Sequence, residues 1–164
     1  MTVSYRVATA RDAARMGEAR RSGDWREGAE ATVMERYLMG EHHPRDALVP
    51  RVALLAEQGA DVVGFIAGHL TRRFGCTAEL QWIYVAAAQR GKGVADVLLR
   101  HLATWCLGQG ARHVCVNVAE DNARARGFYA RNGAQILRPH WMHWPDIGEV
   151  LDTRAPLTPP RAAV

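Results

Sequence analysis

The stretch Gln89-Arg90-Gly91-Lys92-Gly93-Val94-Ala95 joins two segments of different pattern. Residues 78–85 before it alternate as in a strand, and residues 94–105 after it carry an apolar stripe at helical spacing. The glycines allow a tight turn, and the free N–H groups of the first helical turn favour an anion. Arg90 and Lys92 add positive charge. The loop therefore predicts a site for a phosphate or pyrophosphate group.

Two well-known phosphate loops are excluded. The chain contains no GxxxxGK[ST] sequence, which a P-loop requires. A dinucleotide-binding fingerprint needs a third glycine after Gly91 and Gly93, but Asp96 occupies that position and its charge would oppose a dinucleotide. Taken on its own, the loop is also compatible with an ordinary strand-to-helix turn.

Working outward from this loop, the hydrophobic pattern predicts an α/β (α+β-like) fold. Hairpins come first and strand–helix–strand crossovers follow, so we expect a mixed central sheet of about seven strands with helices on both faces. In the strand over 78–85, we expect Leu80, Trp82 and Tyr84 on one side and Glu79, Gln81, Ile83 and Val85 on the other. The expected strands cover residues 3–7, 51–57, 62–70, 78–85, 113–118, 134–137 and 141–144, and the expected helices cover about 9–21, 30–40, 94–108 and 122–132.

Length and composition set further limits. The 164 residues, 48% of them apolar, suit one domain, which we expect over residues 1–152, followed by a proline-containing tail over 153–164. The net charge of +4 suits an anionic partner, but the basic residues occur in short groups typical of a solvated surface. Three cysteines without CxxC spacing argue against a disulfide framework and a zinc site. We therefore expect a cytoplasmic protein with no signal peptide and no membrane span.

Two motifs carry a family resemblance. Arg90-x-x-Gly93-x-Ala95 resembles the R/Q-x-x-G-x-G/A motif of the GNAT superfamily of N-acetyltransferases, and the preceding residues 82–85 are similar to that family's fourth strand. Asn122-Ala123-Arg124-Ala125-Arg126-Gly127-Phe128-Tyr129, closed by Gly133, resembles its N-x-x-A-x-x-(F/L)-Y segment. The resemblance runs over about residues 3–144 and is specific between Glu79 and Gly133.

The resemblance implies acetyl-CoA as co-substrate, bound where the fourth and fifth strands splay apart. The loop amides from Arg90 through Gly91, Lys92, Gly93 and Val94 to Ala95 would bind the pyrophosphate. The backbone at Ile83, Tyr84 and Val85 would bind the pantetheine arm, with an N–H near Ile83 polarising the thioester carbonyl. Asn122 would cap the later helix and touch that arm, or act as a plain helix cap.

The resemblance also implies catalytic roles. Tyr129 matches the general acid that protonates the leaving thiolate, with packing beside Phe128 as the alternative. Glu79 matches a general base, with an exposed strand glutamate or a water-relayed base as alternatives. Some family members carry a glutamate on the fifth strand, where this chain has Asn117. Transfer would be direct in a ternary complex, with no catalytic cysteine, because none has an adjacent His and Asp.

The acceptor is less well specified. Trp25, Tyr37, Trp82 and Trp141 are candidates for lining its pocket, although core packing is the commoner fate of such residues. We expect a small-molecule amine; the alternatives are an amine of a protein or aminoacyl-tRNA, and a non-catalytic CoA-binding regulator. No contiguous basic stripe supports nucleic acid. A homodimer is one option, as in much of the family, and the histidines lack the partners that a metal site needs.

Overall fold

A computed structural model describes residues 2–21, 31–152 and 156–164. In these residues, four α-helices accompany a seven-stranded sheet. The strands are β1 (Ser4–Val7), β2 (Ala47–Gln58), β3 (Asp61–Thr71), β4 (Ala78–Val85), β5 (Val114–Asn117), β6 (Gln135–Arg138) and β7 (Trp141–Trp144). The helices are α1 (Ala13–Arg21), α2 (Ala31–Leu38), α3 (Val94–Gly108) and α4 (Ala123–Arg131), with short 3₁₀ turns at Ala10–Asp12, Arg73–Gly75, Ala87–Gln89 and Ile147–Val150.

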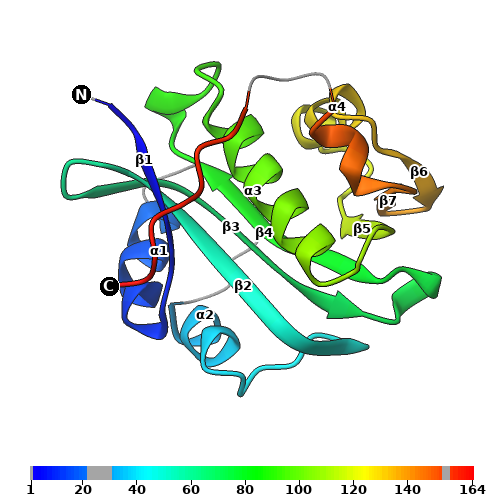
Figure 1. Cartoon of the computed structure of the whole chain (residues 1–164), viewed down its shortest axis with the longest axis horizontal. Coiled ribbons are helices and arrows are strands. Elements are labelled where there is room, and N and C mark those ends of the chain that lie inside the picture. The colour runs from blue at the N-terminus through cyan, green and yellow to red at the C-terminus, as the bar shows by residue number, and fades with distance from the viewer. Residues whose placement is uncertain (1, 22–30, 153–155) are drawn as a thin grey trace.

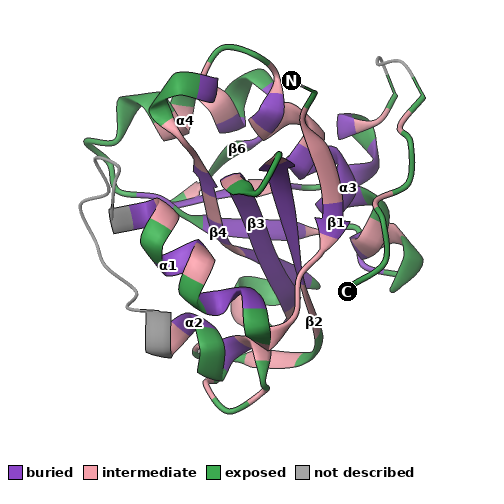
Figure 2. Cartoon of the chain, turned by 90° about the vertical axis from the view of Figure 1, so that its left-hand side faces the viewer, coloured by how far each residue is buried: buried purple, intermediate pink, exposed green. Residues whose placement is uncertain are grey.

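The sheet is mixed and covered on both faces. Its order is β1-β2-β3-β4-β5-β7-β6, and β4–β5 is the parallel pair among antiparallel neighbours. Apolar side chains of α1 and α2 pack on one face around Met16, Met34 and Phe65, and α3 packs on the other around Leu98 and Leu102 (Figure 1). The central strands β3 and β4 lie buried between these layers (Figure 2). This confirms the predicted architecture.

The β2–β3 hairpin is longer than predicted at its outer end. We expected the first strand to begin at Arg51, but β2 begins at Ala47. Pro50 cannot donate a backbone hydrogen bond, and the pairing register shifts between Leu48 and Arg51 to accommodate it. The strand therefore continues through a proline that the sequence pattern presents as a boundary.

The face assignment predicted for β4 is wrong for two of its residues. The register against β3 shifts between Ala67/Trp82 and Gly68/Leu80, so Gln81 is the extra residue of a β-bulge. Leu80 consequently packs in the α3 core with Ile83, whereas Trp82 and Tyr84 pack in the α1/α2 core. Glu79 lies on the same face as Trp82, where it reaches His69. One bulge therefore turns the glutamate toward the α1/α2 side of the sheet.

The described part of the C-terminal tail, residues 156–164, lies beside β1 (Figure 1). Arg161 donates from its backbone to Tyr5, and Val7 donates back to the Arg161 carbonyl, each at 2.9 Å. The Arg161 side chain also reaches Ser4 at 3.1 Å. The tail therefore covers the open edge of the sheet instead of hanging free.

Candidate functional site

The parallel strands β4 and β5 separate partway along their length. They pair from Ala78/Val114 to Leu80/Val116, and β4 then continues to Val85 without a partner on that side. Because β5 ends at Asn117, the second half of β4 faces a gap in the sheet. An extended ligand could hydrogen-bond along this free edge as an additional strand does.

The alternation of the β3–β4 ladder determines which groups face the gap. The Ala86 N–H donates to the Val63 carbonyl at 2.9 Å. Because backbone groups alternate in direction along a strand, those of Tyr84 point toward Phe65 of β3, and those of Ile83 and Val85 point the other way. The Val85 carbonyl confirms this direction, because it accepts from Arg90 Nε at 3.2 Å. Ile83 and Val85 therefore present backbone groups to the gap, and Tyr84 does not.

The glycine loop lies immediately beyond the end of β4. Gly91 and Gly93 have φ of 75° and 82°, and Gly93 is the N-cap of α3. A Cβ at either position would meet nothing within 4 Å, so the loop surface is open. The first-turn amides of Val94 and Ala95 have no partner within the helix and point out of its N-terminus. The loop thus has the form of an anion site, with Lys92 exposed beside it.

The Asn122 motif forms the cap of α4. Its side-chain oxygen accepts from the Ala125 amide at 3.1 Å, which satisfies one free donor of the first turn. The same helix carries Tyr129, which is buried and meets Trp144 edge-on with ring centroids 5.6 Å apart. Burial raises the pKa of the Tyr129 phenol well above its usual value. The phenol is therefore protonated at neutral pH, as a proton donor must be.

Glu79 belongs to a chain of buried polar side chains. Its Oε2 lies 3.4 Å from His69 Nε2, and His69 Nδ1 lies 2.8 Å from the Tyr37 hydroxyl. Arg73 Nε lies 3.7 Å from the same Glu79 oxygen. Glu79 is only 5% exposed, and none of these three facing atoms makes a hydrogen bond, so the carboxylate lies near His69 and Arg73 at ion-pair distance.

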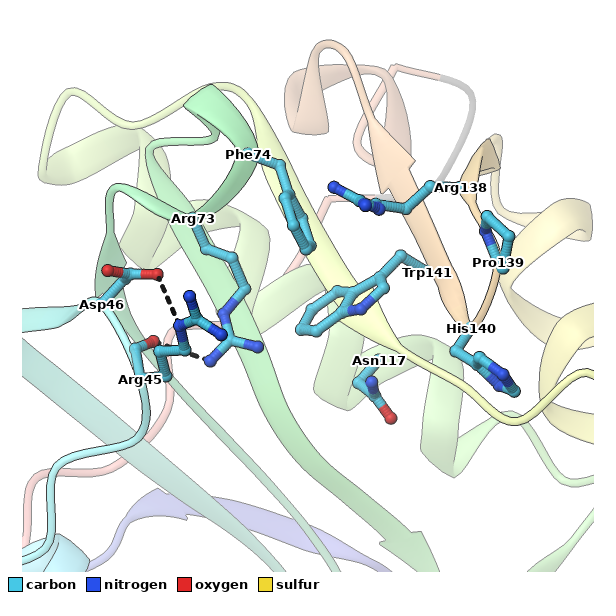
Figure 3. Close-up of a pocket in the computed structure, with 9 residues that line it drawn as sticks. All are labelled: Arg45, Asp46, Arg73, Phe74, Asn117, Arg138, Pro139, His140 and Trp141. Atoms are coloured by element: carbon cyan, nitrogen blue, oxygen red, sulfur yellow. Dashed lines mark hydrogen bonds and ion pairs between the residues drawn. The ribbon is translucent and has the colours of Figure 1, made fainter.

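A pocket of about 690 Å³ opens beside the end of β5 (Figure 3). Four chain segments form it: the approach to β2, the β3–β4 turn, the end of β5 and the β6–β7 hairpin. Arg73 lines the pocket and also contacts Glu79, so it connects the pocket with the buried polar chain. The lining residues are Arg45, Asp46, Arg73, Phe74, Asn117, Arg138, Pro139, His140 and Trp141.

The four aromatic residues predicted to line the acceptor pocket lie in different parts of the fold. Trp141 lines the pocket. Tyr37 is fully buried, and Trp82 packs against it edge-on with ring centroids 4.9 Å apart, so both belong to the α1/α2 core. Trp25 lies outside the described residues. Contact of any of them with an acceptor remains a prediction.

Backbone strain is concentrated at this pocket. In the described ranges, the non-glycine residues with positive φ are Asp46, Phe74 and His140, at 60°, 53° and 65°, and all three line the pocket. Such a conformation costs roughly 1–2 kcal/mol for a residue with a Cβ. Strained residues of this kind cluster at functional sites, since the surrounding structure must hold them in place.

Most of the pocket was missed by the sequence analysis. The pattern presents Arg72-Arg73 as a solvated basic pair and residues 138–140 as a turn. Arg73 and Arg138 line the same pocket because Phe74 and Trp141, from the two turns, pack edge-on with centroids 5.0 Å apart. The sequence did offer one signal, the pair Arg73-Phe74, because an ordinary surface turn has no need of a large aromatic residue.

One cysteine has a histidine beside it. Cys76 Sγ lies 3.6 Å from His113 Nε2, which in turn lies 2.7 Å from His143 Nδ1, so the neighbours are two histidines and not the His and Asp that a nucleophilic cysteine would need. The Cys115 thiol beside it lowers the pKa of Cys76. Cys76 and Cys115 are both buried under Trp141. Strand pairing creates this neighbourhood, since Cys115 lies opposite His143.

Residues 18–134 match the model of the acetyltransferase (GNAT) family. The chain belongs to this family. The match covers most of the chain and includes both motifs that carried the resemblance. As a GNAT acetyltransferase, the chain is an enzyme, which confirms the prediction from residues 79–133.

Solved structures show the same fold at low sequence identity. A GNAT acetyltransferase from Desulfovibrio desulfuricans is 20% identical with a TM-score of 0.68, over 87% of this chain and 96% of that one. Diaminobutyrate acetyltransferase from Paenibacillus lautus, in complex with L-2,4-diaminobutyric acid and coenzyme A, is 20% identical with a TM-score of 0.65, over 89% and 96%. Ribosomal-protein-alanine N-acetyltransferase from Brucella melitensis is 22% identical with a TM-score of 0.62, over 84% and 95%.

Across the described ranges, no helix has the length and apolar character to cross a membrane. Within the same ranges, no three His, Cys, Asp or Glu side chains are arranged to hold a metal ion.

Proposed function

We propose that this GNAT enzyme transfers acetyl from acetyl-CoA directly to the primary amine of a small molecule, with residues 1–152 as one catalytic domain. The gap between β4 and β5 is the observation that carries the proposal. Pairing stops at Leu80/Val116, and the free edge of β4 then leads straight to the glycine loop. A long, thin ligand ending in a pyrophosphate matches this succession of backbone edge and anion site.

In this proposal, each part of the site has one task. The loop from Arg90 to Ala95 binds the pyrophosphate of the cofactor. The Ile83 and Val85 backbones pair with the pantetheine arm, and the Ile83 N–H polarises the thioester carbonyl. Binding at Val85 requires its carbonyl to exchange Arg90 Nε for the ligand, which frees Arg90 for the phosphates. Asn122 touches the arm from the start of α4.

Glu79 and Tyr129 carry the two proton transfers. The ammonium form of the acceptor must lose a proton before its nitrogen can attack the thioester carbon, and the departing thiolate gains a proton. Glu79 accepts the proton from the acceptor. It does so through a bound water, because Arg73 lines the pocket and the Glu79 carboxylate lies behind it. Tyr129, kept protonated by burial, donates the second. No covalent intermediate forms on the enzyme.

The pocket is our candidate acceptor site. Its volume of about 690 Å³ lies in the usual range for small molecules, and it opens where β5 ends beside the gap. The Paenibacillus lautus enzyme acts on a small diamino acid, whereas the Brucella melitensis enzyme acts on a ribosomal protein. The small-molecule size of the pocket favours the former class.

The proposal is tested in two steps. Thermal unfolding with acetyl-CoA, NAD and ATP comes first, and a ligand at 100 times its dissociation constant should add roughly 2.7 kcal/mol of stability. We expect that shift with acetyl-CoA alone. Release of free thiol is then followed with small amines, an alanine-terminated peptide and aminoacyl-tRNA. Equal shifts with NAD and acetyl-CoA would contradict the cofactor, and turnover of only the peptide or tRNA would contradict the acceptor class.

A further inference from the structure

The chemistry of the pocket indicates which amine it accepts, if the proposed function holds. Its wall carries three guanidinium groups, from Arg45, Arg73 and Arg138, against one carboxylate, from Asp46. That carboxylate lies 3.8 Å from Arg45 Nε, so it is already near an arginine of its own segment. The field in the pocket is therefore positive, which opposes a polycation and attracts an anion.

Two of these arginines are held in place by aromatic rings. The Arg138 guanidinium lies over Phe74 at 4.3 Å, and the Arg73 guanidinium lies over Trp141 at 4.8 Å. Because Phe74 and Trp141 pack edge-on, the two stacked guanidiniums lie on either side of one aromatic corner (Figure 3). Stacking leaves the N–H edges of a guanidinium available for carboxylate or phosphate oxygens.

The remaining contacts of the two arginines differ. Arg73 donates from Nη2 to the Arg45 carbonyl at 2.8 Å and approaches Glu79 through Nε, so it is anchored and only 17% exposed. Arg138 is exposed, and among the described residues it stacks on Phe74 with no carboxylate partner. Arg138 thus has its donors free at the mouth of the pocket, and Arg73 supplies a fixed charge deeper inside.

From this arrangement we propose that the acceptor is an amine that also bears an anionic group, a carboxylate or a phosphate, and that Arg138 binds that group while Arg73 supports it. The anionic group then lies at the aromatic corner formed by Phe74 and Trp141. The amine end of the same molecule points toward Asn117, where β5 ends at the gap. Phe74 and His140, whose backbones are strained, lie in the two turns that carry these arginines.

Matched pairs of amines test this inference. Each α- and ω-amino acid is compared with its methyl ester or amide, and phosphoethanolamine with ethanolamine, and spermidine serves as the polycation. A charge-assisted bidentate contact predicts that kcat/KM for the anionic member exceeds that of its neutral partner by about 10- to 100-fold. Whichever of carboxylate and phosphate gives the larger ratio identifies the natural anion. Equal or better turnover of the neutral amines or spermidine would overturn the proposal.

Substitution of Arg138 locates the effect. Arg138→Gln removes an exposed guanidinium, so the variant should fold, keep its acetyl-CoA shift and lose the anionic preference mainly through a higher KM. Arg131→Gln is the matched control, because Arg131 is also exposed and stacks on a phenylalanine, Phe128, at 5.5 Å outside the pocket. An unchanged preference in Arg138→Gln, or an equal loss in Arg131→Gln, would contradict the assignment.

Failure of the proposed function would be seen separately. If acetyl-CoA neither binds nor is turned over, the pocket is still tested by calorimetric titration of the same amine pairs into wild-type protein and Arg138→Gln. Anion-dependent binding that disappears in Arg138→Gln supports the pocket even then. Absence of such binding in the wild type overturns it.

Discussion

His69 Nε2 lies 3.4 Å from Glu79 Oε2, and both side chains are buried on the α1/α2 side of the sheet. The other ring nitrogen of His69 lies 2.8 Å from the Tyr37 hydroxyl, so the imidazole stands between Tyr37 of α2 and Glu79 of β4. The bulge at Gln81 makes this contact possible, because it turns Glu79 to the face on which His69 lies. The proposed base is thus positioned by a partner that also orders α2.

Glu79→Gln tests the base. We expect kcat/KM to fall by about 10²–10⁴ at low pH, where the amine is protonated, and to recover partly as pH rises and free amine accumulates. A pH profile of kcat/KM for wild type and variant measures this, with Glu149→Gln, an exposed glutamate, as the control. A deficit of the same size at every pH would mean that Glu79 positions the acceptor and does not deprotonate it.

Tyr129→Phe tests the acid. The ring keeps its packing against Trp144, and only the hydroxyl is lost. We expect kcat to fall by about 10²–10⁴ while acetyl-CoA affinity is retained, with no recovery at high pH, because the missing proton goes to the leaving group. Steady-state kinetics together with a thermal shift separates the two quantities. The control variant Tyr5→Phe, which is remote from the site, should have wild-type kcat. If Tyr129→Phe also had wild-type kcat, the role of Tyr129 would be packing alone.

Gly93→Glu tests the loop. The new side chain has room, but it carries a negative charge to the anion site and strains a residue with φ of 82°. We expect the acetyl-CoA thermal shift to disappear. Gly110→Glu is a close control, since it has φ of 75° and an open surrounding beyond the other end of α3. Both variants should lose similar stability, of about 1–2 kcal/mol. A normal acetyl-CoA shift in folded Gly93→Glu would place the pyrophosphate elsewhere.

Arg6→Leu tests a buried ionic network that joins β1, β2 and the start of α1. Arg6 contacts Asp12 at 2.7 Å and Glu57 at 3.0 Å, and all three are buried. Removing the arginine leaves Asp12 with Arg15 at 3.5 Å, and leaves Glu57 with Arg15 at 3.0 Å and Arg161 at 3.4 Å. Because these partners remain, we expect a loss of about 3 kcal/mol in the free energy of unfolding at neutral pH, the lower end of the range for a broken buried ion pair. Urea unfolding measures it, with the exposed Arg11→Leu as control.

The same variant has a predicted pH dependence. The hydrogen bond from Arg6 lowers the pKa of Asp12 in the folded protein. A lowered pKa contributes stability above the unfolded value, about 4, and this contribution is lost as pH falls through the folded value. The difference between wild type and Arg6→Leu should therefore be largest at neutral pH and shrink below about pH 4. A difference that is constant with pH would show that lost packing, and not charge, dominates.

Local pattern was sufficient for most of the helices and strands and for the turn geometry of the glycine loop. The predicted strands 78–85 and 141–144 agree with β4 and β7 at both ends, and Asn122 caps α4 as its motif indicates. The Gly91 and Gly93 turn, with its positive φ values, follows from residues adjacent in the chain. Such features depend on neighbouring residues, so the sequence by itself determines them.

Tertiary structure alone decided the face on which Glu79 lies and the identity of the pocket. The bulge at Gln81 arises from how β4 pairs with β3, and a period of two cannot reveal an inserted residue. Arg73 and Arg138 face one cavity because Phe74 and Trp141 pack together across the sheet. In the sequence those arginines are separated by β4, α3, β5 and α4, and each resembles an ordinary surface charge. Only long-range packing brings both of them to the wall of one pocket.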